Sequence, residues 1–120
     1  MPLANELQSQ FSAQQVAGLV GSTSTAITAA GTTQATATVL SSQFNVVTAG
    51  SAFNGVILTT LKGVGDTVDV VNTLSVNICV YPPVGRKFNG ATVNVPVVMS
   101  PNRMCQFECI DGTNWSVDSN

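Results

Sequence analysis

The sequence contains no histidine, and only 8% of its 120 residues are charged. Histidine is the commonest general base and the commonest metal ligand, so its absence removes the usual starting point for acid–base catalysis and for a metal centre. The 6 carboxylates are scattered and belong to no recognised catalytic motif. These absences argue against an enzyme, and we predict no catalytic residue, no cofactor and no bound metal.

Positive charge is equally scarce, since Lys and Arg together number 4. Nucleic acid attracts basic surfaces, so we expect no direct contact with nucleic acid. No apolar run approaches the ~18 residues that a membrane helix needs, and we expect no membrane partner. Isolated protein surfaces usually carry about 25% or more charged residues, so this composition favours an assembly component whose surface is covered by partners.

The 3 cysteines do not form a closed disulfide framework, because an odd number leaves one unpaired. Cys105 and Cys109 would lie about 13 Å apart along a strand, beyond the ~7 Å between Cα atoms that a disulfide spans. We therefore predict that these two and Cys79 are reduced and buried. The N-terminus lacks the cationic and apolar regions of a secretory signal, so we expect synthesis and folding in a reducing cytoplasm.

We divide the chain into an N-terminal arm, residues 1–38, and a β domain, residues 39–120. Apolar side chains recur near the start of the arm at helical spacing, which predicts a short amphipathic helix with a contact surface. These candidate interface residues are Leu3, Leu7, Phe11, Val16, Leu19 and Val20. A helix this short is marginal alone, so it either folds back on its own domain or reaches a neighbouring subunit or another protein.

The remainder of the arm, residues 21–38, consists mostly of Gly, Ser, Thr and Ala. By composition alone this segment would be a flexible linker. Two alternatives stay open for it. It either packs on its own domain or lies on a partner.

Residues 39–120 alternate apolar and polar side chains in short runs that are separated by turn signals. Such signals recur about every 8–12 residues, which is typical of a sandwich or a barrel. Strands are expected at residues 44–48, 56–61, 66–72, 76–80, 93–97, 104–110 and 114–117. The predicted fold class is therefore all-β, an antiparallel β-sandwich or barrel of about 7–8 short strands with an N-terminal helical or extended arm.

Two features inside the β domain suggest a binding role, and each also has a plainer explanation. Tyr81 and Trp115 are the sole phenol and indole, and an exposed aromatic ring commonly binds sugar. A lone Trp in a terminal strand is more often part of the core or of an interface. Arg86 and Lys87 form a small basic tip that suits an acidic partner or a phosphate, although two loop charges usually serve solubility.

Several short segments carry a resemblance through their order and spacing. They are GTTQATAT at 31–38, FNVVT at 44–48, GVIL at 55–58, GDTVDVVN at 65–72, VYP at 80–82, FNG at 88–90, FEC at 107–109 and NW at 114–115. Together they resemble a β module of small virion proteins of tailed bacteriophages, cyanophages among them. The resemblance covers about residues 31–117. One departure is LKG at 61–63, where the module is expected to have a proline-bearing apolar turn.

Modules of this kind occur in capsid decoration (cement) proteins and in phage fibre or spike proteins, which are typically trimeric and carry no catalysis. The resemblance implies a structural virion protein made in the host cytoplasm. It would decorate the outer surface of the phage head as a homotrimer and stabilise the lattice, with the major capsid protein as its partner. The N-terminal apolar residues would anchor the arm to the capsid or to a neighbouring subunit.

The alternative is a head-fibre, tail-fibre or spike module that recognises host-surface glycans. It would use Tyr81, Trp115 or the loop at Arg86 and Lys87. The two functions differ in copy number, since a decorating protein covers the lattice and a fibre module occupies a vertex or a tail.

Overall fold

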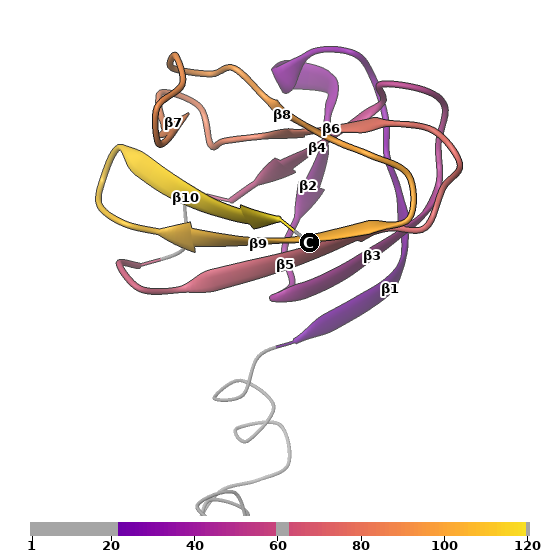
Figure 1. Ribbon diagram of the computed structural model, residues 1–120, viewed down its shortest axis with the longest axis horizontal. Coiled ribbons are helices and arrows are strands. Elements are labelled where there is room, and N and C mark those ends of the chain that lie inside the picture. The colour runs from indigo at the N-terminus through magenta and orange to yellow at the C-terminus, as the bar shows by residue number, and fades with distance from the viewer. Residues whose placement is uncertain (1–21, 60–62, 120) are drawn as a thin grey trace, which may run out of the picture.

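The computed structural model describes residues 22–59 and 63–119, which form a six-stranded and a four-stranded sheet facing each other (Figure 1). The six-stranded sheet holds β1 (Thr23–Thr28), β3 (Phe44–Ala49), β5 (Thr67–Asn72), β7 (Lys87–Phe88), β9 (Arg103–Cys109) and β10 (Asn114–Ser119). The four-stranded sheet holds β2 (Thr38–Leu40), β4 (Gly55–Leu58), β6 (Ile78–Tyr81) and β8 (Val97–Met99). A short 3-10 helix, η1 (Gln34–Thr36), precedes β2. Within these residues no helix has the length and hydropathy needed to span a membrane.

From β1 to β6 the chain alternates between the two sheets, so that it winds like a short solenoid (Figure 1). Each strand in this part runs parallel to its neighbour in the same sheet, β1 to β3 to β5 and β2 to β4 to β6. The direction then reverses, because β8 is antiparallel to β6 and β9 is antiparallel to β5. β10 completes a hairpin with β9, and β7 lies parallel to β10 at the sheet edge.

The all-β class and the presence of two sheets agree with the sequence analysis, but the expected antiparallel arrangement holds only for β5, β6, β8, β9 and β10. Closely spaced turns in a sequence do not show whether a connection leads to the next strand of the same sheet or crosses to the opposite sheet. The second kind of connection makes same-sheet neighbours parallel. The described chain also has more strands than expected, since β1, β2 and β7 were not anticipated.

The strand expected over residues 93–97 is wrong except at its last residue, because β8 begins at Val97. Asn94 adopts a left-handed backbone with φ 67°, which interrupts an extended chain. Pro96 then lacks the N–H that a strand would donate. Residues 93–96 therefore form a loop despite their alternating valines.

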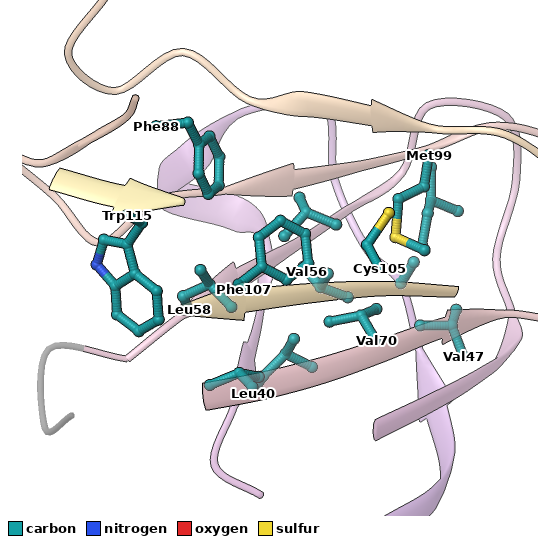
Figure 2. Close-up of a cluster of buried hydrophobic side chains, with 14 of the residues drawn as sticks. Leu40, Val47, Val56, Leu58, Val70, Phe88, Met99, Cys105, Phe107 and Trp115 are labelled. Atoms are coloured by element: carbon teal, nitrogen blue, oxygen red, sulfur yellow. The ribbon is translucent and has the colours of Figure 1, made fainter. Parts of the chain in front are cut away.

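The interior between the sheets is filled by every second residue of the strands (Figure 2). In β5, Val68 and Val70 are buried, whereas Thr67, Asp69 and Val71 on the opposite face are partly exposed. The largest fully buried side chains are Trp115, Phe88, Phe107, Leu40, Leu58, Ile78 and Met99. Each fully buried side chain of this size contributes about 1.5–3 kcal/mol, so the shared interior holds the two sheets together.

The expectation of free, buried cysteines is confirmed. Cys79, Cys105 and Cys109 are all buried and none forms a disulfide. Burial raises the pKa of the Cys79 thiol, and burial with the nearby Asp118 carboxylate raises the pKa of the Cys105 thiol. These thiols therefore behave as small apolar groups at neutral pH.

The segment that leads from β1 to β2 covers the outer face of the four-stranded sheet. Ala37 forms a buried cluster there with Ile57, Cys79 and Tyr81. The Tyr81 hydroxyl donates a hydrogen bond of 3.1 Å to the Thr32 carbonyl. For residues 22–38, packing on the protein's own domain is thus the alternative that the structure supports. The expected N-terminal helix and its apolar residues lie outside the described residues.

Gly55 provides a direct test of this packing. A Cβ atom at this position would lie 2.7 Å from Tyr81 Cε2 and 3.2 Å from Ala37 Cβ. We expect Gly55→Ala to lower the free energy of unfolding by about 1–3 kcal/mol, because the aromatic ring would have to move. Urea unfolding of the variant measures this loss.

Gly112→Ala is the matched control, since a Cβ there would meet no atom within 4 Å. Its stability should lie within about 0.5 kcal/mol of the wild type. Equal stability of the two variants would contradict the close packing of Gly55 on Tyr81.

Candidate interaction surface

Three exposed valines lie on two neighbouring loops at one end of the molecule. Val84, in the β6–β7 loop, is 69% exposed, and Val93 and Val95, in the β7–β8 loop, are 43% and 44% exposed. The loops are in contact, because the Asn94 N–H donates a hydrogen bond of 2.9 Å to the Arg86 carbonyl. We call these three residues the valine tip. The two loops that carry it precede and follow β7 in Figure 1.

The side chain of Asn94 fixes the geometry of the tip. Its Oδ1 accepts hydrogen bonds from the Gly85 N–H at 2.7 Å and from Gln34 Nε2 at 3.1 Å. Gln34 Nε2 also donates to the Pro82 carbonyl at 2.9 Å. Asparagine tolerates the left-handed backbone found here better than most residues do. The valines are therefore held on loops that are ordered before any partner arrives, which reduces the entropy lost on binding.

The β9–β10 turn is hydrogen-bonded to the start of β7, the strand that connects the two loops of the tip. The Lys87 N–H donates a hydrogen bond of 2.9 Å to the Thr113 carbonyl. In the same turn, Asp111 Oδ1 accepts from the Thr113 N–H at 2.7 Å and from the Asn114 N–H at 2.8 Å. These bonds, the Asn114 side chain and the positive charge of Arg86 lower the pKa of Asp111. A polar, hydrogen-bonded turn thus lies beside the strand that connects the two loops of the tip.

The residues singled out for glycan binding are placed differently from one another. Tyr81 is 7% exposed and Trp115 is fully buried, so neither ring forms an exposed platform. Arg86 and Lys87 are half-buried at the base of the tip. The predicted interface residues Leu3, Leu7, Phe11, Val16, Leu19 and Val20 lie outside the part of the chain that the structure describes.

Sequence reasoning missed the valine tip. Val93 and Val95 alternate with polar residues and so resemble the buried face of a strand. The signal that identifies the segment as a loop is Pro96, which interrupts a strand. Likewise, Pro82 and Pro83 mark the end of β6 just before Val84.

The described residues offer little reactive chemistry beyond this surface. No group of three or more His, Cys, Asp or Glu side chains among them is placed to hold a metal ion. A hollow of ≈ 330 Å³ lies at the edge strand β8, and its lining mixes apolar side chains such as Val97, Met99 and Val117 with Ser100 and Arg103.

Comparison of the chain with protein-family models, with curated proteins and with solved structures finds no match.

The role of Asn94 can be tested without changing its backbone conformation. Asn94→Gly retains the left-handed φ but removes the side-chain acceptor, so we expect the Gly85 amide to exchange about tenfold faster with solvent. Asn94→Asp keeps an acceptor and should leave the exchange slow. Hydrogen exchange followed by NMR measures both, and unchanged exchange in Asn94→Gly would show that another group fixes the loop.

Asp111 predicts a pH dependence of stability. Its folded pKa lies below the unfolded value of about 3.9, so it stabilises the fold above that pH and the contribution is lost as the pH falls through the folded pKa. Asp111→Asn does not titrate. The wild type should therefore exceed the variant in stability at pH 7, and the difference should shrink at about pH 3.

Urea unfolding at the two pH values measures this difference, with Asp118→Asn as a control for the loss of one negative charge. A difference between wild type and Asp111→Asn that is the same at both pH values would contradict the role assigned to Asp111.

Proposed function

We propose that this protein is a capsid decoration (cement) protein, which binds the outer surface of a bacteriophage head as a homotrimer. The observation that carries the proposal is the valine tip, three exposed apolar side chains on loops already fixed by hydrogen bonds. The resemblance of residues 31–117 to a phage virion module and the scarcity of charge over the whole chain support the same function.

The proposed mechanism is mechanical. The tip packs on an apolar surface of the major capsid protein, where full burial of each valine would contribute about 1.5–3 kcal/mol. Few charges have to be desolvated in such a contact, which lowers its cost. A trimer presents three copies of the tip at once, so individually modest contacts add through multivalency. The capsid lattice would thereby gain stability against internal DNA pressure.

The fold suits this role as we interpret it, namely as a short β-solenoid closed by the returning strands β8, β9 and β10. The parallel strands form a stiff body, and the loops at its end form the contact. A rigid body with a preordered contact transmits force between capsomers without first having to reorganise.

The first experiment is the copy number of the polypeptide per purified virion, measured by quantitative mass spectrometry against the major capsid protein. Decoration of the lattice predicts hundreds of copies. A handful would place the protein at a vertex or a tail, overturn the proposal and favour the fibre or spike module.

A second experiment tests the tip itself. We expect Val84→Asp with Val93→Asp to reduce occupancy on decorated heads about tenfold or more, because two carboxylates would be buried in an apolar contact. Both side chains are exposed, so the fold should be preserved. Occupancy is measured by co-sedimentation of purified protein with undecorated heads.

Val64→Asp is the matched control, because Val64 is 74% exposed in the β4–β5 turn, outside the tip. It should bind like the wild type. Equal occupancy of the tip variant and this control would show that the tip is not the contact.

A further inference from the structure

An exposed phenylalanine lies at the end of β6 opposite to the valine tip. Phe53, in the β3–β4 loop, is 51% exposed, and among the described aromatic residues it alone is classed as exposed. Its N–H donates a hydrogen bond of 2.7 Å to the Asn77 carbonyl, just before β6 begins, whereas Val84 of the tip follows the end of β6. In Figure 1 the β3–β4 loop shares its end of the molecule with the β5–β6 and β8–β9 connections.

The backbone of Phe53 has a conformation that large side chains rarely adopt. Its φ is 62°, in the left-handed region that favours glycine and asparagine. The loop is held in this shape by the bond to Asn77 and by the Ser51 N–H, which donates to Asn54 Oδ1 at 2.7 Å. Backbone strain of this kind persists where the surrounding structure enforces it, and it is concentrated at functional sites. The ring is therefore presented in a fixed place before any partner binds.

The hollow at β8 lies on a side of the molecule where the edges of both sheets are open. β8 is an edge strand of the four-stranded sheet, and β10 pairs with β7 only through Asn114 and Trp115. Val97 and Val117, which line the hollow, are only partly buried although they pack against the core. Within one molecule this margin of the core is therefore incompletely covered.

The hollow suits an aromatic ring in size and in chemistry. Its volume is ≈ 330 Å³, and a cavity of about 150 Å³ already accommodates benzene. The difference leaves room for Ala52, the small exposed residue beside Phe53. Met99 and Arg103 in the lining carry a thioether and a guanidinium group, both of which make favourable contacts with aromatic rings.

Within one molecule the ring stays outside the hollow, because Phe53 is exposed and is not among the residues that line it. A second copy of the chain can supply the ring instead. Such a contact joins two different sites, and it closes into a small ring of copies only if these sites lie on adjacent sides of the molecule. They do, because Asn77, the partner of Phe53, precedes Ile78, and Ile78 is in register with Met99 of the hollow.

We propose that Phe53 of one copy inserts into the β8 hollow of the next copy, and that three such contacts close the homotrimer. The inference rests on the proposed function for the number of copies, but it does not depend on the capsid. A purified trimer that is present in only a handful of copies per virion would overturn capsid decoration and leave this interface standing. A purified monomer that is present in hundreds of copies would do the reverse.

The test is the oligomeric state of the full-length protein, measured by sedimentation velocity over a range of concentrations. The wild type should be a trimer. Phe53→Asn suits the left-handed backbone but removes the ring, so the concentration at which half of the protein is trimeric should rise about tenfold or more. Val64→Asn is the matched control, because it removes an exposed apolar side chain from the β4–β5 turn, and it should assemble like the wild type.

A mixing experiment tests whether the ring and the hollow form one contact. Ser100 is exposed and lines the hollow, so Ser100→Trp should fill it without disturbing the core, and this variant alone should lose assembly. Phe53→Asn retains an open hollow and Ser100→Trp retains the ring. Mixed at high concentration, the two should therefore form a dimer of one copy each through a single intact contact.

Unfolding in urea at the same midpoint as Val64→Asn shows that each variant is folded. The proposal is overturned by a wild type that is monomeric or dimeric, or by Phe53→Asn assembling as well as Val64→Asn does. Wild-type assembly of Ser100→Trp, or a mixture without the dimer, would likewise show that the hollow does not receive Phe53.

Discussion

The structure depends on one packing constraint, which is that successive strands of opposite sheets must turn their apolar side chains toward a single interior. Val47, Val56, Val70 and Val80 come from four consecutive strands, β3 to β6, and all are fully buried. Because the chain crosses from sheet to sheet at each connection, every turn of the winding adds side chains to the same core. The end loops are free of this constraint, which leaves the valine tip available for another role.

Two buried asparagines, Asn45 and Asn72, join backbone segments of the winding through hydrogen bonds. Asn72 Nδ2 donates to the carbonyls of Val76 at 2.9 Å and Ser100 at 3.1 Å, and its Oδ1 accepts from the Leu74 N–H. It thereby ties the β5–β6 connection to the β8–β9 connection, where the chain has reversed its direction. At the other end of the sheet, Asn45 Nδ2 donates to the carbonyls of Ser42 and Asp69. The Asn72 amide, whose donor and acceptor both have partners, favours this one arrangement, because another would leave a buried polar group without a partner.

The strands β3, β5, β9 and β10 were predictable because their side chains alternate, and alternation is a local property of the sequence. The sheet to which a strand belongs depends on contacts far along the chain, so the parallel winding was not predictable. β1 was hidden because its threonines and serine have the composition of a linker, although threonine also favours strands. At the candidate site, the charges of Arg86 and Lys87 drew attention to the loop beside the tip. The exposure of Val93 and Val95 escaped notice, because alternation does not tell which side of a segment meets solvent.

The hydrogen bonds of Asn94 have a consequence for the order of folding. Gln34 and Asn94 stand 60 residues apart in the sequence, and contacts of such separation form late because a long loop must first be closed. During synthesis the N-terminal strands leave the ribosome first, before Asn94, whose Oδ1 accepts these hydrogen bonds, has been added to the chain. An incomplete or misfolded chain would therefore lack the ordered valine tip.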